Sequence, residues 1–210
     1  MFFHTIEQGL ATLTLSRPNK ANALTETMLA AVADAVEEAA ATDLRALILT
    51  GEGRVFSAGA DLDEVARGLA LSPQWARLSG LIAGLPCLTI AALNGTVAGG
   101  AHGMVLACDI RIAVPQARFF YPVMRLGYLP PSGDAGRMAA LIGPARTRMI
   151  LMAGQKIPAE QALQWGLIDE IAPPDGLMAR ARELAADALA ADPAHVAAIK
   201  AQTTGGQAAG

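Results

Sequence analysis

The stretch from Thr89 to Asp109, TIAALNGTVAGGAHGMVLACD, decides how the rest of this chain is interpreted. Its apolar start ends at Asn94-Gly95, and the pair Gly99-Gly100 then opens a second apolar segment with helical spacing. This order predicts a buried strand, a sharp turn and a helix whose first turn has almost no side chains. A helix start leaves backbone N–H groups unpaired, and glycine lets another atom approach them closely. The stretch therefore predicts a site for an oxygen that gains negative charge, although close helix packing would explain the two glycines equally well.

The composition indicates one large soluble domain. The chain has 210 residues, of which 53% are hydrophobic and 17% charged, so it can bury a substantial core. Its formal charge is -3 and its basic residues are scattered, so neither nucleic acid nor an anionic membrane is an expected partner. Cys87 and Cys108 lie in apolar runs, which predicts two reduced core thiols in a cytoplasmic protein, and neither a disulfide nor a metal pair. No apolar run reaches the length of a membrane span.

The N-terminal third shows the pattern of a strand pair followed by a strand, helix and strand. Residues 2–6 and 10–15 alternate around Gln8-Gly9, which predicts the strand pair. Thr25 precedes an amphipathic helix, and residues 46–50 form a short apolar run typical of a buried strand. This order implies parallel pairing with a right-handed crossover.

A second group of small residues follows that strand. The segment from Val55 to Leu62, VFSAGADL, leaves the predicted sheet through a flexible turn and enters a helix that Asp61 or Asp63 would cap. Backbone N–H groups are therefore exposed at two places, each after a core strand. Two such places can supply the pair of donors that a thioester oxygen needs.

Three blocks of sequence carry a family resemblance in the same order along the chain. They are LSRPNKANALT at 15–25, ALILTGEGRVFSAGADLDE at 46–64, and TIAALNGTVAGGAHGMVLACDIRIA at 89–113. A fourth block, ARFFYPVMRLGYLPPSGDAGRMAALIG at 117–143, is similar but diverged. On these blocks the chain resembles the crotonase superfamily, whose best-known member is enoyl-CoA hydratase. The resemblance extends from Leu15 to about Pro174.

The resemblance implies an α/β fold, a crotonase-like spiral of strand-strand-helix repeats with a C-terminal helical region. We expect a core domain over residues 1–174, C-terminal helices over 175–204 and a disordered tail over 205–210. It further implies an acyl-CoA or enoyl-CoA thioester as the substrate, with coenzyme A as part of that substrate and no tightly bound cofactor or metal. A homotrimer or a dimer of trimers is the implied assembly.

The resemblance also assigns site residues. The oxyanion hole would be the backbone N–H groups of Ala60 and Gly100, and coenzyme A would bind beside four further positions. These cofactor-binding positions are Ala23, Ala58, Asp61 and Leu62.

The departures from the family pattern concern proton transfer. A hydratase of this family uses two glutamates, and the matching positions here hold Gly103 and Val123. A third position, acidic in isomerase and dehalogenase relatives, holds Pro131. Ordinary hydration by two glutamates is therefore not expected.

Two titratable residues near these positions remain as candidates. Asp134 lies three residues beyond Pro131, where a shifted loop would bring it toward the substrate carbon; it is equally placed to cap the helix that follows. His102 adjoins the glycine pair, where it is either an imidazole that titrates near neutral pH or a packed or interface histidine.

Three functions fit the sequence. The first is a CoA-thioester enzyme, a lyase or isomerase, that stabilises an enolate. The second is a CoA-thioester binder without turnover, as the residues at 103, 123 and 131 would allow. The third is a diketone carbon–carbon hydrolase of the same fold that acts without coenzyme A and relies on His102 and Asp134.

Overall fold

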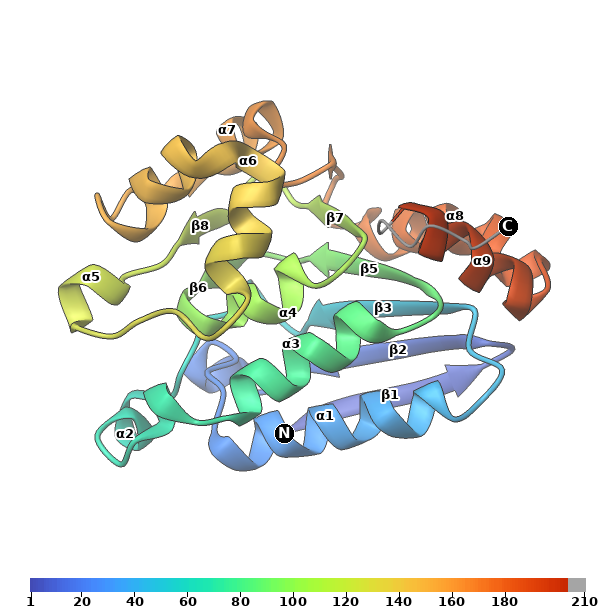
Figure 1. The fold of residues 1–210 in the computed structure, drawn as a ribbon, viewed down its shortest axis with the longest axis horizontal. Helices are drawn as coiled ribbons and strands as arrows, with labels where there is room; N and C mark the ends of the chain where they lie inside the picture. Colours follow the sequence, from blue (N-terminus) through green and yellow to red (C-terminus); the bar gives the residue numbers. More distant parts are fainter. Residues whose placement is uncertain (204–210) are drawn as a thin grey trace.

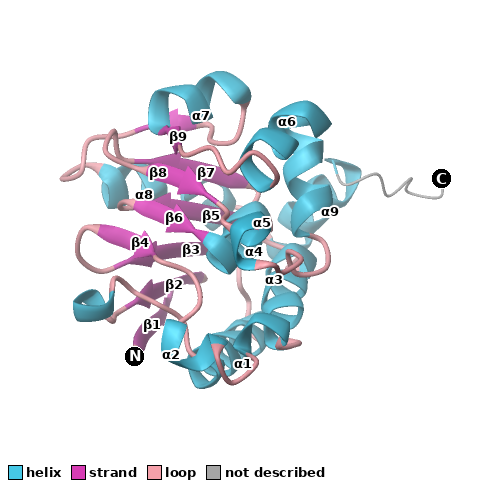
Figure 2. Cartoon of the chain, turned by 90° about the vertical axis from the view of Figure 1, so that its left-hand side faces the viewer, coloured by secondary structure: helices cyan, strands magenta, loops and turns pink. Residues whose placement is uncertain are grey.

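The computed structural model describes residues 1–203, and it has two β-sheets with helices around them (Figures 1 and 2). The larger sheet has six strands in the order β1-β2-β3-β5-β7-β10 and the smaller has four in the order β4-β6-β8-β9. The larger sheet consists of β1 (Phe2–Glu7), β2 (Leu10–Leu15), β3 (Ala46–Gly51), β5 (Leu88–Leu93), β7 (Ile110–Ala113) and β10 (Glu170–Ile171). The smaller consists of β4 (Val55–Ser57), β6 (Thr96–Ala98), β8 (Arg118–Phe120) and β9 (Ile157–Pro158).

The N-terminal strand pair is confirmed. β1 and β2 pair antiparallel around Gln8 and Gly9, which both have positive φ. Along β2, residues 11, 13 and 15 are buried and their neighbours are only partly covered, as the alternating pattern predicts. The parallel pairings that follow, β2 with β3, β3 with β5 and β5 with β7, place the carboxyl ends of these strands at one edge of the sheet.

Two helices cover one face of the larger sheet. They are α1 (Glu26–Ala40) and α3 (Gln74–Gly84), which pack against each other (Figure 1). The predicted cap of α1 is confirmed, since the Thr25 hydroxyl accepts a hydrogen bond from the Met28 backbone N–H at 3.2 Å. Such a cap stabilises a helix by about 1 kcal/mol.

The remaining helices are short, except for three near the C-terminus. They are α2 (Leu62–Val65), α4 (His102–Leu106), α5 (Val123–Leu126), α6 (Asp134–Leu151), α7 (Ala159–Trp165), α8 (Leu177–Ala190) and α9 (Pro193–Thr203), with 3-10 turns η1 (Pro18–Lys20), η2 (Leu69–Leu71) and η3 (Gly99–Ala101). Helix α6 is kinked at Gly143, whose φ is 78°. None of the helices in residues 1–203 is both long and apolar enough to cross a membrane.

The C-terminal helices α8 and α9 lie at the opposite end of the molecule from α5 (Figures 1 and 2). The Lys200 ammonium holds α9 there, because it donates to the Asp109 carboxylate at 2.8 Å and to the Cys87 carbonyl at 2.9 Å. Both cysteines are buried and free, as predicted. The division at residue 174 stays a prediction, and the expected tail, 205–210, lies outside the described residues.

The stretch from Thr89 to Asp109 contains one element that its sequence pattern did not predict. Strand β5, the turn and helix α4 are present, but the three residues of β6 form a further strand between the turn and the glycine pair. This short strand carries the chain from the larger sheet into the smaller one. A three-residue strand is too short to show a period in the sequence.

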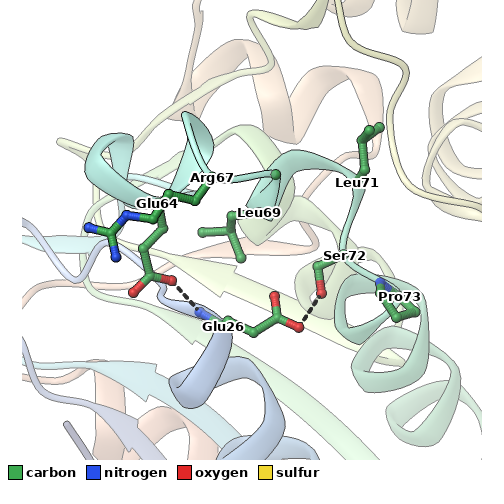
Figure 3. Close-up of a pocket in the computed structure, with 8 residues that line it drawn as sticks. Glu26, Glu64, Arg67, Leu69, Leu71, Ser72 and Pro73 are labelled. Atoms are coloured by element: carbon green, nitrogen blue, oxygen red, sulfur yellow. Dashed lines mark hydrogen bonds between the residues drawn. The ribbon is translucent and has the colours of Figure 1, made fainter.

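The segment between Asp61 and Ser72 crosses from the smaller sheet to the helices α1 and α3. Asp61 caps α2 by accepting from the Asp63 N–H at 3.0 Å. Figure 3 shows that Glu26 joins both ends of the segment to α1: its backbone N–H donates to the Glu64 carboxylate, and its own carboxylate accepts from the Ser72 hydroxyl, both at 2.8 Å. These bonds tether a segment that also forms one wall of the cavity described below.

Candidate active site

Two loops meet where the neighbouring strands β4 and β6 end. The strands pair in parallel, so the loops that follow them leave the sheet side by side. Gly59 has a φ of +85°, and a Cβ built on it would lie 2.6 Å from the Ala98 carbonyl oxygen and 3.4 Å from the Gly99 Cα. Only glycine fits so close an approach of two backbones. The two predicted groups of small residues therefore touch.

The first loop is hydrogen-bonded to Leu24, and the pairing directs the Ala60 amide away from that residue. Leu24 donates its N–H to the Gly59 carbonyl and accepts from the Asp61 N–H, so it bridges the residues on either side of Ala60. In parallel pairing the middle residue of such a bridge faces the other way. Within residues 1–203, no hydrogen bond between elements uses the Ala60 N–H.

The second loop presents the first turn of η3. Gly100 is the second residue of that turn, where no upstream carbonyl is available to its N–H. A Cβ on Gly100 would lie 2.9–3.1 Å from three atoms of the Trp75 ring. That ring is held in place because its Nε1–H donates to the Leu69 carbonyl at 2.8 Å. Packing against Trp75 thus explains the second glycine of the pair.

Ala60 and Gly100 line the same cavity, which encloses about 320 Å³. Its wall is apolar apart from backbone groups, two tyrosines and Arg125. Leu62 and Leu129 are largely exposed at its rim. The full lining comprises Ala58, Ala60, Leu62, Val65, Ala70, Trp75, Ala98, Gly99, Gly100, Phe120, Tyr121, Pro122, Val123, Arg125, Leu126, Tyr128, Leu129 and Pro131.

Of the four cofactor-binding candidates, the structure brings Ala58 and Leu62 to the cavity. Ala23 and Asp61 lie behind its wall. Arg17 joins them, since its guanidinium donates to the Ala23 carbonyl at 2.8 Å and to the Asp61 carboxylate at 2.7 Å. That hydrogen bond lowers the pKa of Asp61 below its ordinary value. Here both residues fix the first loop.

Behind the cavity, Asp134 forms a buried pair with Tyr121. The Tyr121 hydroxyl, which belongs to a residue of the cavity wall, donates to Asp134 Oδ2 at 2.8 Å. Asp134 Oδ1 has no hydrogen-bond partner among the described residues. Burial raises the pKa of Asp134 to about 6, while the hydrogen bond from Tyr121 and the positive charge of Arg137 oppose that rise. Burial also raises the pKa of Tyr121, so its hydroxyl stays protonated.

The capping interpretation of Asp134 is wrong. Gly133, with a φ of 96°, is the N-cap of α6, and Asp134 is its first helical residue with no cap bond from a side chain. The carboxylate instead lies against α4: a Cβ built on Gly103 would be 3.0 Å from Asp134 Oδ1 and 3.3 Å from Oδ2. The family resemblance implies a glutamate at position 103. The structure has a glycine there, and the Asp134 carboxylate covers its backbone.

His102 is buried beside the same pair. Its ring stacks on Tyr121 with centroids 5.1 Å apart and an interplanar angle of 15°. Its Nδ1 lies 3.0 Å from the Gly99 carbonyl oxygen, and its Nε2 has no partner among the described residues. Burial lowers the pKa of His102 to about 4, so the ring is neutral at pH 7. Of the two interpretations of His102, the structure supports the packed histidine. A pKa of about 4 does not fit the other, an imidazole that titrates near neutral pH.

The family model described as Enoyl-CoA hydratase/isomerase matches residues 5–206, almost the whole chain. The chain belongs to the enoyl-CoA hydratase/isomerase family. The predicted crotonase fold is confirmed by a solved enoyl-CoA hydratase from Bacillus anthracis, which has a TM-score of 0.89 and 28% identity over 97% of this chain and 82% of that one.

Relatives within the enoyl-CoA hydratase/isomerase family catalyse different reactions. The 2,3-dehydroadipyl-CoA hydratase of Escherichia coli (strain K12) is 35% identical over 202 residues, covering 92% of this chain and 78% of the relative. The 1,2-epoxyphenylacetyl-CoA isomerase of the same strain is 33% identical over 190 residues, covering 86% and 72%. Identity at this level shows the family without distinguishing a hydratase from an isomerase.

Proposed function

We propose that this protein is an enzyme that converts an acyl-CoA or enoyl-CoA thioester through an enolate. The observation that carries the proposal is that Ala60 and Gly100, from two loops in contact, line one apolar cavity. Both N–H groups would donate to the thioester oxygen, where negative charge collects when a proton leaves the neighbouring carbon. One such donor in a dry site lowers the barrier by roughly 3 to 4 kcal/mol.

Asp134 is the proposed proton acceptor, and it acts through Tyr121. Tyr121 lines the cavity, and its hydroxyl already donates to the Asp134 carboxylate. In the proposed step, the α C–H bond breaks and its proton passes to the Tyr121 oxygen while the hydroxyl proton passes to Asp134 Oδ2. The electron pair of the C–H bond forms a carbon–carbon double bond, and the π pair of the carbonyl moves onto the thioester oxygen, so the negative charge of the carboxylate is transferred to the enolate. A pKa of about 6 leaves Asp134 mostly ionised at pH 7, so it can accept a proton. The pKa is also close enough to pH 7 for the protonated carboxyl to give the proton back.

The side chains favour one class of reaction within the family. Gly103, Val123 and Pro131 carry no carboxylate, and Asp134 is the acidic residue that adjoins Tyr121. Hydration with two glutamates needs two acid–base groups, whereas moving a double bond needs one group that removes a proton and returns it at another carbon. We therefore favour isomerisation or a related one-base reaction.

The test is exchange of the α proton of butyryl-CoA in deuterated solvent, followed by mass spectrometry. We expect the wild-type protein to exchange it and Asp134→Asn to slow exchange strongly. Asp34→Asn is the matched control, because Asp34 is an exposed residue of α1 that pairs with Arg77.

Calorimetric titration with acetyl-CoA and free CoA separates the alternatives. Binding of acetyl-CoA without any exchange would identify a non-catalytic thioester binder. Binding of neither ligand would overturn the proposal in favour of the diketone hydrolase. The trimeric assembly stays a prediction, which sedimentation would test.

A further inference from the structure

The Gly99–Gly100 peptide carries one of the two proposed donors and has no side chain to restrict it. Gly99 has a φ of +53°, and neither glycine has a Cβ to restrict rotation of the peptide plane between them. The Gly100 N–H belongs to that plane. A donor preorganised for catalysis needs its direction fixed before substrate binds.

The other end of the same peptide is held by His102. The Gly99 carbonyl accepts from the His102 backbone N–H and lies 3.0 Å from His102 Nδ1. A carbonyl oxygen only accepts hydrogen bonds, and the buried ring is neutral, so its proton must be on Nδ1. In a trans peptide the C=O and N–H groups point in opposite directions. A bond that fixes the Gly99 carbonyl on one side therefore fixes the Gly100 N–H on the other.

The surroundings of the ring hold it for this task. Tyr121 stacks on one face, and Phe119 meets the ring edge-on with centroids 6.4 Å apart. The remaining nitrogen, Nε2, is buried with no partner in the described part of the chain, an arrangement that is destabilising by itself. An apolar side chain would avoid that loss.

We propose that His102 is a positioning residue, whose Nδ1–H holds the Gly99 carbonyl so that the Gly100 N–H points into the cavity. This inference rests on the proposed function, because it assigns the Gly100 amide to the thioester oxygen. It gives His102 no proton to transfer. It also couples the oxyanion hole to the proton-transfer pair, since the ring that orients Gly100 stacks on Tyr121.

Three variants separate donation by Nδ1 from simple filling of space. His102→Asn places an amide N–H where Nδ1–H stood, His102→Gln places one nearer to Nε2, and His102→Leu has no donor. We expect His102→Leu to lower the turnover number for α-proton exchange at least about tenfold with little change in KM, because the lost alignment acts on the transition state. His102→Asn should restore most of the rate and His102→Gln should not. Equal rates in His102→Leu and wild type, or failure of His102→Asn to exceed His102→Leu, would overturn the inference.

Infrared spectroscopy of a bound thioester tests the proposed oxyanion hole without requiring turnover. Hydrogen bonds to the thioester carbonyl lower its stretching frequency, so bound acetyl-CoA labelled with ¹³C at the carbonyl should show a red shift in the infrared. His102→Leu should lose about half of that shift, because one of two donors is misaligned, and His102→Asn should keep it. A wild-type spectrum with bound acetyl-CoA and no red shift would instead contradict the proposed oxyanion hole itself.

A ligand-free measurement decides the inference even in that case. The chain has three histidines, so ¹⁵N-histidine NMR resolves His102. The expected result is a neutral ring protonated on Nδ1 that does not titrate between about pH 5 and 8, and a Gly100 amide resonance that shifts in His102→Leu and is restored in His102→Asn. A ring protonated on Nε2, or a Gly100 resonance that ignores all three variants, would overturn it.

Discussion

Two clusters of polar side chains around buried residues lie at different places in this fold, and they differ in how many of their polar atoms have hydrogen-bond partners. The cavity cluster comprises His102, Tyr121 and Asp134, and it leaves His102 Nε2 and Asp134 Oδ1 without partners in the described residues. The sheet-end cluster is built on Arg111 and Asp169. There each guanidinium nitrogen donates, to the carbonyls of Leu167, Cys108 and Asp109 and to the Asp169 carboxylate, at 2.6–3.3 Å.

This difference separates a structural cluster from a chemical one. Buried polar groups are normally hydrogen-bonded, because an orphaned group loses its hydration with no return. The Arg111 cluster follows that rule and joins β7 to the chain before β10. The cavity cluster breaks it beside the cavity, and its carboxylate, Asp134, is the proton acceptor of the proposed reaction. Removing the first should harm stability, and removing the second should harm activity.

The largest expected effect is on catalysis, in Asp134→Asn. General acid–base groups contribute roughly 10²- to 10⁴-fold, so exchange or isomerisation should slow within that range. Stability at pH 8 should not fall, because the variant removes a buried charge. Stopped-flow assays and urea unfolding measure the two quantities. A rate within threefold of that of the Asp34→Asn control would show that Asp134 is not the base.

The opposite pattern is expected for Arg111→Met. Arg111 is buried but its partner Asp169 is exposed, so the loss of stability should come mainly from buried carbonyls left without a donor, which costs roughly 1 to 3 kcal/mol each. Urea unfolding should show that loss, while activity per folded molecule is unchanged. Arg148→Met is the control, since Arg148 is exposed on α6. A turnover number that falls with stability would erase the contrast between the clusters.

A smaller, pH-dependent effect should come from Asp134 in the folded protein. Its pKa is raised from 3.8 to about 6, so the folded state holds its proton more tightly than the unfolded state. The resulting stabilisation is complete below pH 3.8 and is lost as pH rises through about 6. A shift of this size corresponds to roughly 3 kcal/mol at most. The difference in free energy of unfolding between wild type and Asp134→Asn, measured with urea between these pH values, should fall as the pH rises. A difference that does not change with pH would contradict the raised pKa.

The smallest expected change in stability is in Tyr121→Phe. The variant removes one hydrogen bond to the Asp134 carboxylate, worth roughly 1 to 2 kcal/mol at pH 8. Because that bond lowers the pKa of Asp134, its loss should raise the pKa above the wild-type value. Carboxyl ¹³C NMR of Asp134 would follow the titration. An unchanged midpoint would mean that the two side chains are not coupled in solution.

Much of the fold could be predicted from local pattern. The strand pair at the N-terminus and the capped helix α1 follow from alternation, helical spacing and a capping residue, which act between near neighbours in sequence. Strand β6 was missed because its pairing partners, β4 and β8, are remote and its own three residues show no period. The predicted convergence of the two loops is a consequence of that pairing.

The candidate site shows the same limit more sharply. The exposed backbone at 58–60 and 98–100 could be predicted, because glycine is favoured where the chain turns sharply or another backbone approaches closely. Asp134 in α6 contacts Tyr121, which follows β8, and Gly103 in α4. The spacing of these three residues in the sequence does not predict that contact. The same holds for the ring of Trp75 over Gly100, since α3 is far from it in sequence. Side chains brought together by tertiary packing leave no local signal.

The parallel pairing of β4 and β6 has a consequence for how this enzyme family can diversify. Neighbouring strands stand about 4.8 Å apart whatever their side chains, so main-chain bonds fix the distance between the ends of β4 and β6, from which the two loops start. Substitutions on the cavity wall can change the shape of the cavity without altering that distance. The proposed pair of amide donors would therefore be kept while the residues around the cavity change.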